Sequence, residues 1–551
     1  MEDTEMKIAR FSSCRGVSFE INSNRSNPFA VESPTKPERT TGTWLWIPWT
    51  RNNSFKILPQ SQAHIITSPT RSRASSHFCD INIDADDVEL EFLAEFQDIE
   101  NQEKANSVKQ QKLLQKPDPS PRNSRLSIIL LDQGFTVYKG LFLVCITLNM
   151  IALALSATGH FPYAKSRATL FSIGNILALT LCRSEAVLRV VFWFTVKTIG
   201  NICVPLKIKT ATTSFLQSIG GIHSSCGVCS IAWLVYSLVL TIENNDKNTS
   251  PEILGVAFTI LSLISLSSLA AFPLIRHLHH NLFERIHRFS GWMALILLWL
   301  FILLTISYDP TSKTYHLTIK KMVKTQECWL TLFITILIMI PWLSIKRVQV
   351  SVTAPSNHAS IIKFEGGVKP GLLGRISPSP LSEWHAFGII SDGKKEHIML
   401  AGAVGDFTKS LVSSPPKHLW IRSVHFAGLP YLINLYQKVL LVATGSGICV
   451  FLSFLLQPTK ADVCLIWVAK DIEMNFGKEI TDLVGRYSKE KVIVHDTAVS
   501  GRPNVAEMSV NAAIHWNVEV VIVTSNPEGS RDVVRACNKA KVPAFGPIWD
   551  S

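Results

Sequence analysis

Charged residues are scarce in this 551-residue chain: Asp, Glu, Lys and Arg make up only 17% of it, whereas 47% is hydrophobic. The mean hydropathy of +0.22 is too high for a single water-soluble domain, and the length suggests three or four structural units. The eleven cysteines lack the spacing of an extracellular disulfide framework, so we expect reduced thiols. No charged stretch followed by an apolar core opens the chain, so no cleaved signal peptide is predicted.

A concentrated basic surface is also missing, although the formal net charge is +12. The lysines and arginines are scattered through loops and the C-terminal half, and no basic stripe with interleaved aromatic residues occurs. Nucleic-acid binding is therefore not expected, and the charge is interpreted as flanking membrane segments.

Residues 1–125 are rich in Ser, Asn, Thr and Pro and show no sustained hydrophobic periodicity. Within them, residues 80–103 are strongly acidic and carry a few apolar residues at helical spacing. We predict a mostly disordered cytoplasmic tail whose acidic segment is a docking helix for a protein partner.

Long apolar segments dominate the next region, residues 126–347. Six of them approach or exceed the length needed to cross about 30 Å of hydrocarbon: 138–157, 169–192, 219–242, 253–275, 289–306 and 328–345. The second is the weakest, because Arg183, Glu185 and Arg189 lie in its second half. Glu185 and Arg189 are four residues apart and are placed to pair on one helix face. We predict an α-helical membrane domain of about six spans.

Six spans place both termini on the same side of the bilayer. The lysines and arginines between the segments indicate that side only weakly, because the loop at 313–324 is basic as well. A nucleotide-binding turn in the C-terminal region decides the matter better, since dinucleotides are cytosolic. The chain is therefore predicted to be an integral, multi-pass membrane protein with cytoplasmic termini and with the lipid bilayer as a partner.

The hydrophobic pattern changes twice after the apolar segments. Residues 348–435 contain short alternating or β-branched runs, which predict a small β-barrel. In residues 436–551, strands alternate with helices, which predicts a parallel α/β sheet. The first of these strands leads into a turn made by Thr444, Gly445, Ser446 and Gly447, and Ile448 begins a helix-like run. Glycines at such a turn let backbone amides close on a pyrophosphate.

This order of membrane segments, β-barrel and α/β domain resembles that of the ferric reductase and NADPH oxidase superfamily. The likeness covers residues 138–551 and is greatest to the fungal TmpA-like membrane flavoproteins, including 283–292, 496–497, 501–503 and 545–550. Residues 384–388, Trp-His-Ala-Phe-Gly, are similar to the His-Pro-Phe-Thr flavin motif, with His385, Phe387 and Gly388 as its members here. Residues 405–411, Gly-Asp-Phe-Thr-Lys-Ser-Leu, are similar to an element on the FAD pyrophosphate, here with Gly405 and Thr408. The resemblance implies an FAD-binding barrel and a Rossmann-like NAD(P)-binding domain, as in ferredoxin reductases.

The chain departs from the family pattern at two places. Ala386 stands where the family has proline, and Gly388 replaces the hydroxyl residue that supports the flavin ring. Near the nicotinamide the family often has Cys-Gly-Pro, whereas residues 525–527 are Ser-Asn-Pro, without a cysteine to assist hydride transfer. Lys470, just after the second α/β strand, is placed to meet a ribose 2′-phosphate; the alternative is a solvated loop lysine. No catalytic residue is singled out, and the choice between NADPH and NADH stays open.

Members of the family that bind haem carry two histidines about a dozen residues apart on each of two spans. Here one histidine occurs on each, His223 and His287, so the outer pair is absent. The two would lie at the same cytoplasmic depth as axial ligands of a single haem b. The alternative is ordinary interfacial histidine, with the neighbouring small residues serving helix packing, and we expect that alternative.

Two functions are compatible with these features. The first is a membrane-anchored flavoprotein oxidoreductase that passes electrons from NAD(P)H through FAD to a small-molecule acceptor at the cytoplasmic face. The second is a degenerate, non-catalytic flavoprotein that senses or relays redox state in fungal development or secondary metabolism. A transporter is disfavoured, because no matched repeats or paired broken spans are visible.

Overall fold

The computed structural model describes residues 9–12, 18–21, 136–243, 249–278 and 280–547, apart from the side chains at 277 and 281. The chain divides into two compact units, residues 1–69 and 70–551. In the first unit, strands β1 (Ala9–Ser12) and β2 (Ser18–Ile21) form an antiparallel pair. The predicted acidic docking segment at 80–103 lies outside the described residues.

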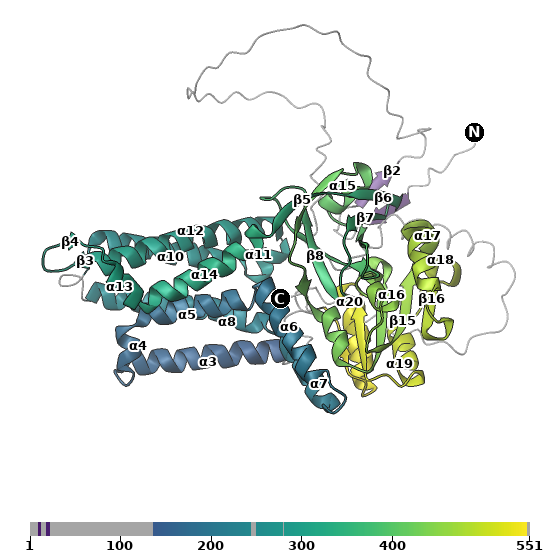
Figure 1. Ribbon diagram of the computed structural model, residues 1–551, viewed down its shortest axis with the longest axis horizontal. Helices are drawn as coiled ribbons and strands as arrows, with labels where there is room; N and C mark the ends of the chain where they lie inside the picture. Colours follow the sequence, from purple (N-terminus) through teal and green to yellow (C-terminus); the bar gives the residue numbers. More distant parts are fainter. Residues whose placement is uncertain (1–8, 13–17, 22–135, 244–248, 279, 548–551) are drawn as a thin grey trace, which may run out of the picture. The chain divides into compact units, whose positions relative to one another are not determined.

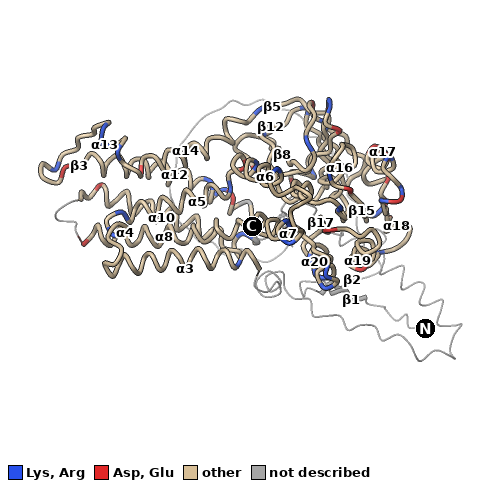
Figure 2. Tube along the Cα trace, turned by 60° about the horizontal axis from the view of Figure 1, so that its bottom comes forward, with Lys and Arg blue, Asp and Glu red and all other residues tan. Residues whose placement is uncertain are grey.

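Helices make up the first described part of the second unit, from Val137 onward, and they form a bundle (Figure 1). By length and composition, five of them are long and apolar enough to cross a membrane: α3 (Val137–Ala157), α8 (Gly220–Glu243), α10 (Pro251–Ala270), α12 (His280–Ser307) and α14 (Gln326–Leu343). Shorter elements connect them: α4 (Pro162–Ser166), α5 (Ala168–Leu181), α11 (Pro273–Leu278), β3 (Tyr308–Asp309), β4 (Thr314–Tyr315) and α13 (Ile319–Lys324). Figure 2 shows few charged residues along the bundle helices and many more in the rest of the unit.

The second predicted span, 169–192, is wrong as a single helix. It is split into α5, which ends at Leu181, and α6 (Glu185–Ile199), which is followed by α7 (Leu206–Gln217). The predicted pair between Glu185 and Arg189 does not form, because Glu185 binds Arg375 and Arg422, while Arg189 donates to the carbonyl of His425 at 3.0 Å. Charged groups leave the apolar bundle because burying them in hydrocarbon without partners is costly.

The chain enters and leaves the bundle at the same end. Tyr138, at the start of α3, donates to or accepts from Ser224 near the start of α8, with 2.9 Å between the oxygens. Trp292 in the first half of α12 packs edge-on against Trp342 at the end of α14, and their ring centroids are 5.0 Å apart. Tyr138 and Trp292 line the same cavity. The start of α3, the first bundle helix, and the end of α14, the last one, therefore lie at the same end of the bundle.

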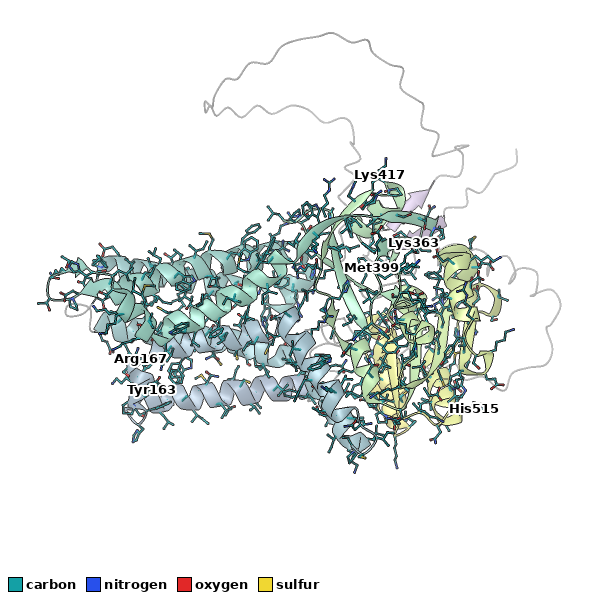
Figure 3. All side chains as sticks on the ribbon, in the orientation of Figure 1. Tyr163, Arg167, Lys363, Met399, Lys417 and His515 are labelled. Atoms are coloured by element: carbon teal, nitrogen blue, oxygen red, sulfur yellow. The ribbon has the colours of Figure 1, made fainter. Side chains whose placement is uncertain are left out.

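Residues 345–427, here called the antiparallel part, form two sheets. One has the order β10-β11-β7-β6, from Ile390–Ser391, Glu396–Gly402, Ala359–Glu365 and Ser351–Ser356. The other has the order β13-β8-β12-β5, with β9 also on β8, from Phe426–Ala427, Leu372–Ser377, His418–Arg422, Ile345–Gln349 and His385–Gly388. The predicted strands are present, but their pairing does not close them into one barrel. Met399, labelled in Figure 3, lies in their shared core.

Residues 429–547, the α/β part, contain a parallel five-stranded sheet in the order β16-β15-β14-β17-β18. The strands are Val492–Asp496, Asp462–Ala469, Lys438–Thr444, Val520–Thr524 and Ala544–Phe545. One face of β14 and β15 shares a core with the antiparallel part, and the other is covered by α19 (Val505–His515) and α20 (Pro527–Lys539). The remaining elements are η2 (Leu429–Leu435), η3 (Gly445–Val450), α16 (Leu452–Leu456), α17 (Ile472–Gly485), η4 (Lys489–Lys491) and α18 (Thr497–Ser500). The predicted parallel α/β architecture is present in this part.

Candidate functional site

The two predicted flavin motifs lie side by side in the antiparallel part. His385 begins β9, which pairs with β8, and its ring stacks on the ring of Phe407 with centroids 4.4 Å apart and an interplanar angle of 7°. Phe407 belongs to the second motif, at the start of α15 (Asp406–Ser413). Phe387 is buried in the core between the sheets. The fold therefore joins the two motifs that the resemblance assigns to one cofactor.

Burial lowers the pKa of His385 to about 4; Glu383 acts in the opposite direction, while Arg375 and His280 add to the lowering. Burial likewise lowers the pKa of His425 to about 4, with the help of His397 and Arg189. Both imidazoles are therefore neutral at pH 7, and His385 brings no charge to the flavin motif.

The antiparallel part is expected to lose stability in mild acid. In the unfolded chain these histidines bind a proton near pH 6.5 as the pH falls. In the native protein their pKa is about 4, so they bind the proton only at a lower pH. The melting temperature should therefore fall as the pH drops from 6.5 towards 4, and His385→Gln should flatten that dependence. The matched control is His418→Gln on β12, where the side chain is exposed. An unchanged slope in the His385 variant would contradict this account.

The first turn of α15 offers unpaired amides to an anion. Thr408 Oγ1 accepts from the amides of Val404 at 3.1 Å and Gly405 at 2.9 Å, and donates to the carbonyl of Gly405 at 3.0 Å. Within the described residues, the amides of Asp406 and Phe407 have no acceptor, as the start of a helix requires. This arrangement fits the pyrophosphate of FAD, which the resemblance places at Gly405 and Thr408.

The glycine-rich turn stands at the point where the parallel sheet changes its winding direction. The chain proceeds from β14 to β15 and β16 on one side, and β17 returns to the other side of β14. Thr444 at the end of β14 donates to Ser525, just after β17, with 2.8 Å between the hydroxyl oxygens. Crevices at the carboxyl ends of strands at such a switch point bind nucleotides in open α/β sheets.

Gly445 has a conformation that favours glycine, with φ +51°, and its carbonyl accepts from Nε1 of Trp467 at 2.9 Å. Ser446, Gly447 and Ile448 follow it, buried in the short helix η3. The turn is therefore tied to β15 through Trp467 and keeps the local geometry that a close backbone approach to a phosphate needs.

The short helix η3, which begins with the nucleotide turn, contacts the strand β9 of the flavin motif through Cys449 and Val450. The buried thiol of Cys449 lies beside the backbone of Gly388, and burial raises the pKa of this thiol to about 12. A Cβ on Gly402, at the end of β11, would lie 3.0 Å from Oγ of Ser446. Sequence reasoning missed Cys449, because no family motif includes it and only the fold brings η3 against β9. It stands beside the flavin motif, at a place different from the expected Cys-Gly-Pro segment.

Gly388 is required by this packing. A Cβ there would lie 2.6 Å from Cγ1 of Val450 and 2.8 Å from its Cα and N atoms. Gly388→Thr, which restores the family's hydroxyl, should therefore lower the free energy of unfolding by about 1–3 kcal/mol. Chemical denaturation measures the effect against the control Ala386→Thr, two residues earlier on the half-buried side of β9. Equal stability of the two variants would show that the contact is not tight.

Two further positions predicted near the nicotinamide nucleotide are Lys470 and Asn526. Lys470 is exposed directly after β15, at the same edge of the sheet as the turn, since Val468 is in register with Thr444. Its predicted contact with a 2′-phosphate stays a prediction. Asn526 caps α20 by accepting from the amide of Gly529 at 2.7 Å. The Ser-Asn-Pro segment thus begins a helix, which explains the asparagine structurally.

His223 on α8 and His287 on α12 line one cavity of about 830 Å³ in the bundle. Nδ1 of His223 lies 3.0 Å from the carbonyl of Leu179, and Nδ1 of His287 lies 2.7 Å from Oγ of Ser267. Nε2 of neither ring has a hydrogen-bond partner within the described residues. The lining also contains Lys139, Arg276 and Arg288 but no Asp or Glu from the part of the chain that the structure describes. Two anchored imidazoles and cations for propionates fit one haem.

The cavity adjoins the antiparallel part near the flavin motif. Arg288 donates through Nη1 to the carbonyls of Leu381 at 3.1 Å and Ser382 at 3.2 Å, shortly before His385. Arg285, on the same helix, binds Glu383 with a nitrogen to oxygen distance of 2.8 Å. The fold therefore brings the predicted haem histidines and the flavin motif into neighbouring layers.

Comparison with known proteins finds similarity to proteins named adenylate-forming reductases. Residues 429–551 match the family model "Adenylate-forming reductase 03009, C-terminal domain". Over 438 and 439 residues, the chain is 31% identical to Adenylate-forming reductases 03009 and 06235 of Coprinopsis cinerea. These matches cover 79% of this chain and 42% of each relative, so the chain spans less than half the length of the relatives it matches. They carry a different name from the ferric reductase superfamily and its TmpA-like branch, and that resemblance stays a prediction.

Solved structures with related folds are more distant. Ferredoxin-NADP+ reductase from Plasmodium falciparum is 12% identical, with a TM-score of 0.28, over 37% of this chain and 95% of that one. The cytochrome b5 reductase domain of Ulva prolifera nitrate reductase is 8% identical, with a TM-score of 0.27, over 37% and 97%. Both TM-scores are below 0.5, and the parallel sheet of this chain is identified by its own strand order.

Proposed function

We propose that this chain is a membrane-anchored flavoprotein oxidoreductase that passes electrons from NADH or NADPH through FAD to a small acceptor at the cytoplasmic face. The observation that carries this proposal is the contact of Gly388 with Cys449 and Val450. Hydride transfer requires a nicotinamide and a flavin in van der Waals contact, so their binding motifs must meet. The printed name of the relatives describes reduction, which is the same class of reaction.

The antiparallel part would hold FAD. The amides at the start of α15 would receive its pyrophosphate, and the strand from His385 to Gly388 would lie along the flavin ring. When bound, FAD takes a hydride from a reduced nicotinamide and passes the electrons on. The chain supplies a neutral His385, held by its stack on Phe407.

The α/β part would hold the nicotinamide nucleotide. Its pyrophosphate would lie against the turn from Thr444 to Ile448, at the switch point between β14 and β17. Lys470 would contact the 2′-phosphate of NADPH, because its exposed side chain lies at the same edge of the sheet as the nucleotide turn. We propose NADPH and NADH as alternatives that a titration separates.

The five apolar helices would anchor the chain, and the shorter α5 would return it between α3 and α8, so that both ends of the bundle lie on the cytoplasmic side. This proposal is supported by the joint end of α3 and α14, because the nucleotide-binding part is attached there and dinucleotides are cytosolic. A haem b held by His223 and His287 is the second cofactor to test, because both imidazoles line one cavity beside the flavin motif. When bound, it would accept single electrons. The acidic tail is proposed to recruit a protein partner.

A visible spectrum of the purified full-length chain, reconstituted with FAD, tests the proposal. We expect a flavin band that bleaches anaerobically on addition of NADPH or NADH. A flavin band indifferent to both nucleotides would instead support the non-catalytic, redox-sensing alternative. The absence of bound flavin would overturn both functions. A Soret band that disappears in the His223→Leu and His287→Leu variants would establish the haem, and its absence would return the histidines to a structural role.

A further inference from the structure

Helices α6 and α7 lie at the end of the bundle that faces the antiparallel and α/β parts (Figure 1). Helix α6 contacts β13 and η2, and α7 contacts η2 and α3. The elements on either side in the sequence, α5 and α8, pack against each other inside the bundle. The chain therefore leaves the bundle after α5 and re-enters it with α8 at the same end.

One face of α6 is packed into the protein. Phe192 is 5% exposed and belongs to the core shared by the antiparallel and α/β parts. Leu188, Val196 and Ile199, which lie on the same side at helical spacing, pack against that core. This face fixes the orientation of α6, since rotating the helix would expose it.

The opposite side of α6 is also apolar and is largely exposed among the described residues, although Val190 and Trp193 border a cavity that they share with the antiparallel part. This outer face consists of Val190, Val191, Trp193 and Phe194, with exposed fractions of 62%, 38%, 50% and 60%. Ile202, in the loop after α6, is 80% exposed. A helix that is apolar on both faces needs an apolar medium or a partner on each.

The charge of this segment points to a lipid surface. Residues 186–218 contain four basic residues and no Asp or Glu: Arg189, Lys197, Lys207 and Lys209. Lys209 is buried and Arg189 donates to the carbonyl of His425, whereas Lys197 and Lys207 are exposed and can face a surface. The ammonium of Lys197 lies 5.2 Å from the centre of the Trp193 ring, so a cation and an aromatic ring stand together at the edge of the outer face. Trp, Phe and Lys in this combination are typical of helices in the headgroup region of a bilayer.

The length of α6 argues against a span and for an interfacial position. Its 15 residues extend about 22 Å, which is short of the roughly 30 Å of the hydrocarbon core. Its first residue, Glu185, is bound by Arg375 and Arg422 of the antiparallel part, outside the apolar bundle. The helix thus begins at the polar edge and stays there until α8 returns to the bundle.

We propose that the outer face of α6 lies in the boundary between headgroups and acyl chains of the membrane that the five apolar helices cross. In this position the bilayer covers one face of α6, and the other face carries the antiparallel and α/β parts. The inference depends on the proposed membrane anchoring and is independent of the flavin chemistry. A second copy of the chain is the alternative occupant, but a segment without any acidic residue favours an anionic lipid surface.

An environment-sensitive fluorescent amino acid placed at single positions tests this. The full chain is reconstituted into nanodiscs of phosphatidylcholine and phosphatidylserine whose acyl chains carry bromine, a contact quencher. Phe194 is the test position, Leu148 in the middle of α3 is the membrane control at 63% exposure, and Val499 on α18 is the water control at 84%. The three labelled chains should have equal melting temperatures.

We expect bromine to quench the fluorescence of the label strongly at position 148, to an intermediate degree at position 194, and not at position 499. Emission at Phe194 as insensitive to bromine as that at Val499, with quenching retained at Leu148, would overturn the inference and leave the anchoring intact. Loss of quenching at both Leu148 and Phe194 would overturn the anchoring itself. Emission at Phe194 that changes with protein concentration but not with bromine would assign the outer face to a second copy.

Discussion

Gly445→Val should abolish the bleaching of the flavin band by a reduced nicotinamide while the flavin stays bound. At φ +51° a β-branched side chain costs about 1–3 kcal/mol of backbone strain, and its methyl groups would occupy the space above the amides that face a phosphate. The nucleotide concentration needed for half reduction should rise on the order of 10- to 100-fold or more. Anaerobic titration followed by the flavin absorbance measures this, and Gly447→Val should act in the same direction.

The matched control is Gly485→Val in α17 of the same α/β part. Gly485 is exposed, a Cβ there would meet no atom of the described residues within 4 Å, and a helix tolerates valine better than glycine. Because the FAD motifs are on other strands, both variants should keep the flavin band. Normal bleaching in Gly445→Val would mean that the turn does not bind the nucleotide.

Glu185→Gln should separate the bundle from the antiparallel part. The Glu185 carboxylate binds Arg375 and also Nη1 of Arg422, the latter at 3.2 Å, and its own side chain is 14% exposed. Burial opposes the ionisation of Glu185, but the two arginines outweigh burial and lower its pKa. Removing the charge leaves two partly buried guanidinium groups uncompensated, at a cost of about 3 kcal/mol. Thermal unfolding of the full chain and limited proteolysis near 345 measure the loss.

The control for this variant is Glu383→Gln. Glu383 joins the same two regions through Arg285, but that arginine is 64% exposed, so the change should cost less than about 1 kcal/mol. The lowered pKa of Glu185 gives a further check with a defined sign. Its contribution is present above the ordinary carboxyl pKa and is lost as the pH falls through the lower native value. Equal destabilisation by the two variants would refute the role of the buried clamp.

Local signals were enough for much of the fold. Period and length predicted five of the membrane-length helices, and the β-branched runs predicted the strands of both later parts. The segment 169–192 was mispredicted as one helix because a hydropathy average contains no information about the distant residues with which its charged side chains pair. Only the tertiary structure shows that Glu185 finds Arg375 and Arg422, more than 180 residues away in sequence, which makes a break at 182–184 favourable.

The sequence predicted the separate motifs of the candidate site but not the contacts between them. The turn at Thr444–Gly447 is recognisable from sequence because close backbone approach to a phosphate favours closely spaced glycines directly after a strand. The sequence showed that Gly388 replaces the family's hydroxyl residue, but it did not show the contact of Gly388 with Val450, because two segments 62 residues apart have no sequence pattern that reveals their packing. Likewise, spacing placed His223 and His287 at one depth, but the shared cavity and the anchored Nδ1 atoms depend on α5 and α10 as well.

The sequence alone determined the order of the parts, the apolar helices, the parallel α/β pattern and the glycine-rich turn. Each of these depends on the chemistry of neighbouring residues in the chain, such as hydropathy, β-branching and the freedom of glycine. The tertiary structure decided which of these elements meet: the flavin motif with Cys449, the two histidines in one cavity, and α6 with the antiparallel part instead of the bundle. Such contacts depend on packing and charge pairing between distant segments, and their energies appear only when the whole chain is folded.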